Sequence, residues 1–137
     1  MTVRFYNTVD DALLKFAVIV AKHQNQWVFC KHRERSTLEC PGGHREPGES
    51  IKQTARRELW EETGAVDYTL SPICVYSVER EDVETYGMLY FAEIIRFEPL
   101  PALEIEKIEL LDEPPDNWTY PLIQPKLLAH VAQTMQL

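Results

Sequence analysis

The segment Gly43–Ala65 reads GHREPGESIKQTARRELWEETGA and carries the clearest helix signal in the chain. Ser50 followed by Gln53 has the spacing of a capping box, in which the two side chains satisfy backbone N–H groups at the start of a helix. Gly64 is placed to end the helix, because glycine adopts the left-handed conformation found after a last helical turn. The pattern predicts a helix over residues 50–63.

Three carboxylates lie on one side of this helix. Glu58, Glu61 and Glu62 are spaced at i, i+3 and i+4, within about 100° of arc. They repel one another, and an apolar stripe overlaps the same arc, so they cannot all turn away from the core. Arg57 supplies one positive charge against three negative ones. A divalent cation would compensate the remaining negative charge. Carboxylate oxygens without Cys or His favour Mg²⁺ or Mn²⁺ over zinc, although RELWEE alone could equally be a solvated acidic face.

The whole segment resembles the Nudix box, Gly-x5-Glu-x7-Arg-Glu-U-x-Glu-Glu-x-Gly-U, in which U is a bulky apolar residue. The residues that match its fixed positions are Gly43, Glu49, Arg57, Glu58, Leu59, Glu61, Glu62, Gly64 and Ala65, the last being smaller than usual. The resemblance implies a hydrolase that cleaves a nucleoside diphosphate linked to another group, by attack of water on phosphorus. It also implies an α/β/α sandwich with a mixed β-sheet.

The resemblance assigns a role to each part of the box, which covers residues 43–65. Arg57 would hold the glutamates in place beside the reacting groups, with Glu58 and Glu61 counted among the catalytic residues. Glu49 would fix the geometry between loop and helix or reach the metals through water, and Gly64 would end the helix. Gly42, with the following glycine, would let the backbone approach the ion closely. The implied ligands of Mg²⁺ or Mn²⁺ are Gly43, Glu58, Glu61 and Glu62.

The strand pattern extends over most of the chain. Apolar or alternating runs at residues 15–22, 27–31, 73–78, 88–97 and 105–111 predict strands, and residues 125–136 predict a closing helix. A chain of 137 residues is the size of one domain. We therefore expect a single α/β domain over residues 1–137, in which helices pack on a mixed sheet.

Composition excludes several classes of protein. The longest apolar run, residues 16–21, is far shorter than the ~20 residues of a membrane helix, and no signal-peptide pattern follows Met1. Cys30, Cys40 and Cys74 show neither a CxxC pair nor zinc spacing, so reduced thiols are expected. These features predict a cytoplasmic protein without a membrane partner.

Charge is distributed unevenly along the chain. The net charge of −8 argues against general nucleic-acid binding. Residues 1–57 carry ten Lys or Arg against six Asp or Glu, whereas residues 58–137 carry four against sixteen. A basic cluster beside an acidic one suits a small polyphosphate that is bridged by a metal ion.

The stretch VFCKHRERSTLECPGG, residues 28–43, resembles the strand and loop before the box in MutT-type enzymes, which clear oxidised purine triphosphates such as 8-oxo-dGTP. An arginine at the position of Arg33 contacts substrate in that group, and Arg35 belongs to the same basic cluster. Asn117 ends a PPDN segment similar to one whose asparagine reads the base. The alternatives are a solvated strand end for the arginines and a turn residue for the asparagine.

MutT-like members carry a further glutamate on the loop before the strand that precedes the last helix, where it binds metal or deprotonates water. Glu104 matches that position best, within LEIEKIELL at residues 103–111. Strand alternation would place Glu104, Glu106, Ile108 and Leu110 on one inward face. The alternatives are a solvated edge strand, or the same role for Glu106 or for a glutamate of the box.

Three functions are compatible with these features of the sequence. The first is a nucleoside triphosphate pyrophosphohydrolase, favoured because subfamily markers for ADP-ribose, dinucleoside polyphosphate, NADH and coenzyme A substrates are missing. The second is a Nudix enzyme with another substrate, including the triphosphorylated 5′ end of RNA. The third is a nucleotide-binding regulator without activity, disfavoured because the glutamate set is complete. Nudix domains are often dimers, so the resemblance is compatible with a homodimer.

Overall fold

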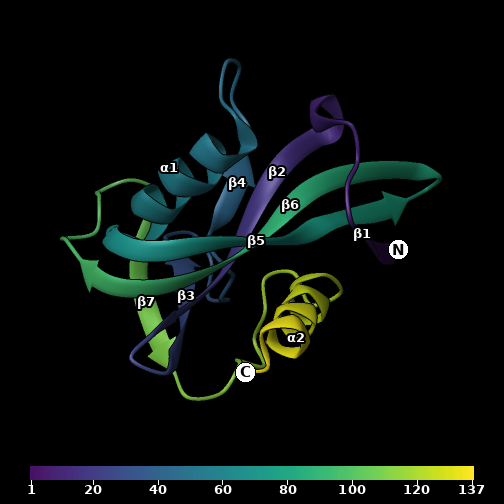
Figure 1. Ribbon diagram of the computed structural model, residues 1–137. Helices are drawn as coiled ribbons and strands as arrows, with labels where there is room; N and C mark the ends of the chain where they lie inside the picture. The colour runs from purple at the N-terminus through teal and green to yellow at the C-terminus, as the bar shows by residue number, and fades with distance from the viewer.

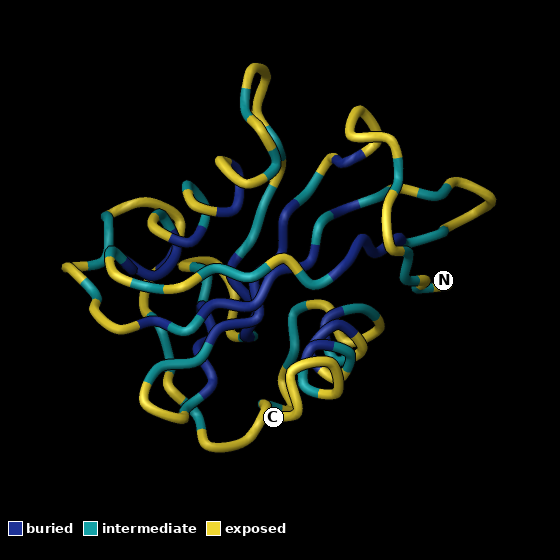
Figure 2. Tube along the Cα trace, viewed as in Figure 1, coloured by how far each residue is buried: buried dark blue, intermediate teal, exposed yellow.

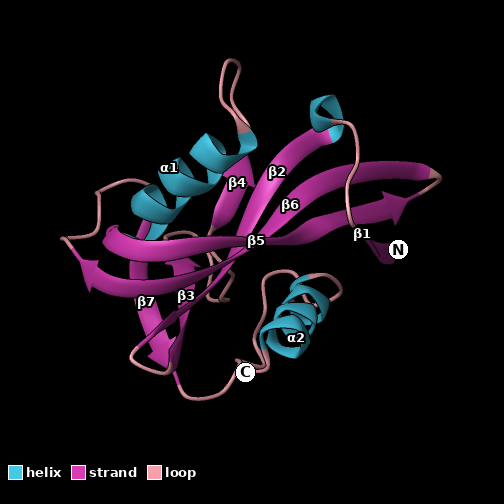
Figure 3. Cartoon of the chain, in the orientation of Figure 1, coloured by secondary structure: helices cyan, strands magenta, loops and turns pink.

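The computed structural model describes residues 1–137 as two helices packed on a seven-stranded sheet (Figures 1 and 3). Helix α1 and helix α2 lie on opposite faces of that sheet. The elements in chain order are β1 (Thr2–Tyr6), the short 3-10 helix η1 (Asp11–Leu13), β2 (Leu14–His23), β3 (Gln26–His32), β4 (Gly42–His44), α1 (Ile51–Thr63), β5 (Ala65–Arg80), β6 (Val83–Phe97), β7 (Ile105–Leu111) and α2 (Gln124–Met135).

The sheet is mixed. Its strand order is β1-β5-β6-β2-β3-β7, with β4 paired to β2 beside the main path. β2 and β6 run parallel, and the other neighbouring pairs are antiparallel. The expected α/β/α sandwich is thereby confirmed.

Strand β2 separates two apolar cores, because successive side chains of a strand point to opposite faces. Ala17 and Ile19 pack with Ala55 and Leu59 of α1 on one face. On the other face, Val18 and its alternate neighbours pack with the apolar side of α2. The buried centre of the sheet is continuous in Figure 2, while the hairpin tips and loops are exposed.

Two hairpins turn on residues with positive φ. Gln24 and Asn25 join β2 to β3, and Glu81 and Asp82 join β5 to β6. Both links were expected to be loops, but the strands around the second one are longer than the sequence predicts. The additional residues of β5 and β6 pair with each other along nearly the whole hairpin. Pairing between the two strands therefore extends them beyond their apolar runs.

Strand β4 was not expected, since Pro41-Gly42-Gly43 is typical of a break in regular structure. In the structure Gly42 and Gly43 pair with Val18 and Ala17 of β2. A Cβ at position 42 would collide with the Ala17 carbonyl oxygen, so glycine permits this close approach. The pairing places Gly43, the first residue of the Nudix-like segment, within the sheet.

The three cysteines are buried and none forms a disulfide. Neither helix is long and apolar enough to cross a membrane.

Candidate active site

Helix α1 has both predicted caps. The Ser50 hydroxyl accepts from the Gln53 N–H at 3.1 Å, and the Gln53 side chain accepts from the Ser50 N–H at 2.8 Å. Gly64 has φ of 79° and donates its N–H to the Trp60 carbonyl. With Leu59 fully buried against the sheet, these caps fix the rotation of the helix. Glu58 and Glu62, which precede and follow Leu59 on the same helix, are therefore held at the border of the core.

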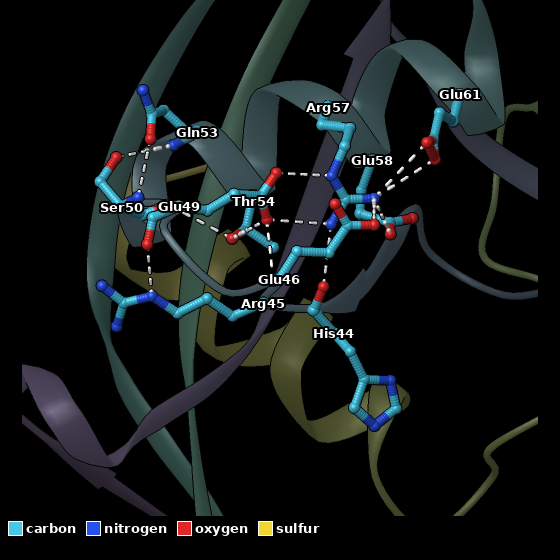
Figure 4. Close-up of polar contacts among 10 residues, drawn as sticks. All are labelled: His44, Arg45, Glu46, Glu49, Ser50, Gln53, Thr54, Arg57, Glu58 and Glu61. Carbon is cyan, nitrogen blue, oxygen red and sulfur yellow. Dashed lines mark hydrogen bonds and ion pairs between the residues drawn. The ribbon is translucent and has the colours of Figure 1, made fainter.

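Arg57 lies at the centre of the glutamate array (Figure 4). Its Nε donates to Glu49 Oε2 at 2.6 Å, and its Nη1 donates to Glu58 at 2.8 Å and to Glu61 at 3.3 Å. Its Nη2 donates to the His44 carbonyl at 2.9 Å. The planar guanidinium thus ties the loop before α1 to three carboxylates, which is the geometry needed to hold them in place.

Glu49 is fully engaged by donors. Besides Arg57, the Thr54 hydroxyl and the Glu46 N–H donate to its carboxylate, each at 2.9 Å. These hydrogen bonds, led by that of Arg57, lower the pKa of Glu49 to about 2. The residue joins the loop to the helix (Figure 4), and it lies outside the large cavity described below.

Glu62 has the opposite environment. It is 8% exposed, and the structure gives its carboxylate one hydrogen bond, from the Gly42 N–H at 2.9 Å. Burial raises the pKa of Glu62 to about 8, and the negative charges of Glu58, Glu39 and Glu104 act in the same direction. No cationic side chain is paired with this carboxylate, so its charged form lacks a counterion.

Glu58 lies against the backbone of β4. Burial raises the pKa of its carboxyl above the usual value, although Arg57 opposes that shift. A Cβ at position 43 would collide with the Glu58 carboxylate. Glycine is therefore required there for the carboxylate and the backbone to approach so closely.

A cavity of about 660 Å³ opens between α1, β4, the residue before β7 and the start of α2. Arg57 and both glycines of β4 also line it. Glu61 does not line it and lies beside Arg57 instead. The acidic residues of its wall are Glu39, Glu46, Glu58, Glu62 and Glu104.

These residues suit a divalent cation. No three His, Cys, Asp or Glu side chains are already gathered as a ligand cluster, and Arg57 donates hydrogen bonds to Glu58 and Glu61. Yet Glu62 is desolvated without a cationic partner, and the wall of the same cavity carries the carboxylates of Glu58 and Glu104. Such hard donors fit Mg²⁺ or Mn²⁺, and Glu58 and Glu62 line the cavity beside Gly43, whose carbonyl is the further ligand that the resemblance implies.

Glu104, the residue before β7, lines this cavity. Its side chain is 78% exposed and its Oε2 lies 3.7 Å from His32 Nε2. Glu106 instead pairs with Lys31 Nζ at 3.1 Å and does not line the cavity. The site therefore distinguishes the two candidates by position.

The predicted alternation of β7 is wrong at the start of the strand, while Ile108 packs against the core as expected. Ile105 is 1% exposed and packs inward, whereas Leu110 is exposed. The cause at Ile105 is a register shift between Lys31 and His32, where β3 pairs with the start of β7. Such an irregularity inserts a residue on one strand and reverses which side chains face inward beyond it.

The three residues expected to contact substrate lie in different places. Arg35 lines the cavity, pairs with Glu39 at 2.9 Å and lies over the Tyr120 ring. Arg33 points elsewhere: its Nε donates to the Leu103 carbonyl at 2.9 Å. Asn117 is exposed, donates to the Ser36 carbonyl and is not part of the cavity wall.

Sequence reasoning missed three cavity residues. Gln124 and Tyr76 are buried polar side chains, and Glu39 is a buried carboxylate. None belongs to a spaced motif, and Gln124 meets the loop before β4 across 84 positions of sequence. The buried Glu39 follows an apolar residue and precedes a cysteine, which is a weak sequence signal.

Comparisons with known proteins agree with this geometry. The model of the NUDIX domain family matches residues 13–119. The chain is 31% identical over 104 residues to YtkD of Bacillus subtilis (strain 168), a protein named as a proposed 8-oxo-dGTP diphosphatase. That alignment covers 75% of this chain and 65% of YtkD, so the chain spans less than two thirds of that relative.

Two solved structures share the fold. The Bacillus subtilis pyrophosphohydrolase BsRppH superposes with a TM-score of 0.80 at 24% identity, covering 96% of this chain and 90% of that one. A UDP-X diphosphatase superposes with a TM-score of 0.76 at 16% identity, covering 94% of this chain and 66% of that one. At these identities the likeness concerns the fold.

Proposed function

The chain belongs to the Nudix family, and from this premise we propose that it is a pyrophosphohydrolase that converts a nucleoside triphosphate, with a divalent cation, to the monophosphate and pyrophosphate. The observation that carries the proposal is the pair of Glu58 and Glu62. Both are desolvated carboxylates with raised pKa values in one cavity, and Glu62 has no cationic partner. Perturbed carboxylates of this kind are typical of sites that bind a cation and act on charged substrates.

The chain's own groups would bind and orient the reactants. A divalent ion held by Glu58, Glu62 and the Gly43 carbonyl would neutralise phosphate charge and lower the pKa of a bound water. Arg57 would keep Glu58 and Glu61 oriented through its hydrogen bonds to both. Arg35, at the rim of the same cavity, is placed to pair with a phosphate oxygen.

Glu104 is our candidate for accepting the proton of the attacking water. As the water oxygen bonds to phosphorus, the bond from phosphorus to the bridging oxygen breaks and the proton passes to a carboxylate. Glu104 lines the cavity with an exposed side chain, so it can turn toward that water. Glu58 is less free, because Arg57 and the backbone of Gly43 confine it.

An oxidised purine such as 8-oxo-dGTP is the substrate that we favour. The similarity to YtkD supports it, as does the MutT-like stretch before the box. Triphosphorylated RNA 5′ ends are the second candidate, since the fold is like that of BsRppH. The homodimer stays a prediction, which sedimentation of the purified chain would test.

A substrate panel tests the proposal. Purified protein with Mg²⁺ would be offered dGTP, 8-oxo-dGTP, triphosphorylated RNA, a UDP-sugar and ADP-ribose, with pyrophosphate and phosphate measured separately. We expect the highest kcat/KM for a nucleoside triphosphate, with pyrophosphate as the released product. Turnover of the UDP-sugar or ADP-ribose alone would contradict the proposal, and binding of nucleotide without any turnover would indicate a non-catalytic domain.

A further inference from the structure

Arg45 follows β4 directly and begins the loop before α1 (Figure 4). Its backbone N–H donates to the Lys15 carbonyl at 2.8 Å, so the pairing of β4 with β2 continues for one residue beyond His44. The Arg45 side chain is 20% exposed and does not line the large cavity. Its positive charge is therefore used in contacts within the protein and not in contacts with a substrate in that cavity.

The guanidinium of Arg45 joins the loop to the segment before β2. Its Nε donates to the Glu49 carbonyl at 2.8 Å, which closes the loop on itself. Its Nη1 donates to the Asp11 carbonyl at 3.0 Å, and its Nη2 donates to the Asp11 carboxylate at 2.9 Å. All three nitrogens are engaged, and a planar fork bonded in this way fixes the two segments in one relative orientation.

The hydrogen bonds that join this loop to residues 10–15 all come from Arg45. The tip of the loop, Pro47 and Gly48, is exposed, and Gly48 has a left-handed backbone. Two further hydrogen bonds join Glu46 and Glu49 to each other, so they shape the loop without attaching it to the sheet. Removal of the Arg45 side chain would therefore loosen the loop on the side of β2.

Glu49, at the end of this loop, holds Arg57 in turn. The Glu49 carboxylate accepts from Arg57 Nε at 2.6 Å and from Nη2 at 3.1 Å, so Nη1 is the nitrogen that reaches Glu58 and Glu61. If Glu49 moved away, the guanidinium of Arg57 would be free to pair more closely with Glu58. It would then compete with a divalent cation for that carboxylate.

We propose that Arg45 is a positioning residue: anchored by Asp11, it holds Glu49 in place and thereby keeps Glu58 accessible to the cation. The inference rests on the proposed function and adds a support to the same site. Asp11 precedes residues 13–119, which the family model matches, so the anchor lies outside the matched domain. Residues that orient metal ligands from behind commonly contribute about tenfold or more to metal affinity or activity.

Binding of Mn²⁺ to the protein without nucleotide tests the inference, because the electron paramagnetic resonance signal of free Mn²⁺ falls on binding. Arg45→Ala should raise the Kd for Mn²⁺ and lower kcat, each by about tenfold, with little change in KM for the nucleotide. Arg45→Lys should recover part of both, since one ammonium reaches fewer of the acceptors. Arg56→Ala is the control, because that exposed arginine donates to the Tyr68 hydroxyl and should leave both constants unchanged.

Asp11 and its neighbour Asp10 provide a second matched pair, away from the loop and the cavity. Asp11→Asn removes the charge that anchors Arg45 and should raise the Kd for Mn²⁺ a few-fold. The Asp10 side chain forms no capping hydrogen bond, so Asp10→Asn should leave that Kd unchanged. Circular dichroism establishes that each variant is folded under the conditions of the binding measurement.

An unchanged Kd for Mn²⁺ in folded Arg45→Ala would overturn the inference, as would a rise in KM with kcat preserved. If Arg45→Ala does not fold, Arg45→Lys and Asp11→Asn decide by the same measurement, and unchanged Mn²⁺ binding in both overturns it. Mn²⁺ binding that weakens in the Arg45 variants, in a protein that hydrolyses no nucleoside triphosphate, would support the inference and overturn the proposed function.

Discussion

Glu49 and Glu62 are carboxylates of one short segment whose pKa values are shifted in opposite directions. Donors from Arg57, Thr54 and the Glu46 backbone lower that of Glu49 to about 2, whereas burial raises that of Glu62 to about 8. A carboxylate with all its partners inside the protein has a structural task. A carboxylate that is buried without a counterion, such as Glu62, is suited to bind a positively charged ligand.

Glu104 and Glu106 form a matched pair for testing proton transfer. Glu104→Gln removes a carboxylate from the cavity and should lower kcat about a hundredfold or more, with little change in nucleotide affinity. Glu106→Gln removes a carboxylate paired with Lys31 outside the cavity and should leave kcat within a few-fold. Steady-state kinetics decide between them; near-normal kcat for Glu104→Gln would move the role to Glu58.

Arg33 and Arg35 should differ in the kinetic constant that they affect. Arg33 donates from its backbone N–H to the Glu104 carbonyl, and its side chain donates to Leu103, so Arg33→Ala should mainly lower kcat by loosening the loop that carries Glu104. Arg35→Ala should mainly raise KM, because Arg35 lines the cavity and supplies binding charge. If Arg33→Ala raised KM alone, Arg33 would be a direct substrate contact, as the MutT resemblance implies.

At the scale of elements, the loop before α1 and the helix itself behave as one unit. The capping box, the Arg57 hydrogen bonds and Gly64 fix both ends and the rotation of the helix. β4 completes the unit by bringing Gly42 and Gly43 against Glu62 and Glu58. The carboxylate end of the site, with Glu58 and Glu62, is thus made by one helix packed beside one short strand.

Gly64 and Gly48 share a left-handed backbone and differ in surroundings. A Cβ at position 64 would collide with the Glu98 carbonyl, whereas nothing lies near a Cβ at position 48. Gly64→Ala should lower the free energy of unfolding by more than about 2 kcal/mol, and Gly48→Ala by about 1 kcal/mol. Urea titration measures both, and equal losses would show that backbone conformation alone sets the cost.

Glu84 links three strands and should make stability depend on acid. Ser77 of β5, Tyr6 of β1 and Tyr86 of β6 donate hydroxyl hydrogen bonds to it, at 2.5, 2.6 and 2.9 Å, and these lower its pKa from 4.5 to about 2. A lowered pKa in the folded state stabilises above pH 4.5, and the gain is lost as pH falls toward 2.

The variant Glu84→Gln should therefore lose less stability than the unaltered protein over that range of pH. Urea midpoints at several pH values measure the slope. Glu81→Gln, at the exposed tip of the same hairpin, is the control and should keep the steeper dependence. Equal slopes for the unaltered protein and Glu84→Gln would contradict the hydrogen-bonded arrangement.

At the scale of the molecule, features set by neighbouring residues could be predicted from the sequence. Contacts between segments that are far apart in the sequence could not. The capping box and the glutamates spaced at i, i+3 and i+4 are local patterns within one helical segment. The sequence alone therefore predicts α1 and carries the resemblance to the Nudix box. β4 depends on pairing with β2, and the inward faces of β7 depend on a register shift opposite β3, which no periodicity reveals. Gln124 is held in the site by a hydrogen bond from the Cys40 N–H, 84 positions earlier in the chain, which no local motif could reveal.

The central claim is that Glu62 and Glu58 bind the cation used to split a nucleoside triphosphate. Phosphorus NMR of the reaction with Mg²⁺ tests it most directly, comparing the unaltered protein, Glu62→Gln and a sample with chelator. We expect monophosphate and pyrophosphate from the unaltered protein, and loss of turnover by several orders of magnitude in both other samples. Release of single phosphate, or near-normal turnover by folded Glu62→Gln at saturating Mg²⁺, would contradict the account.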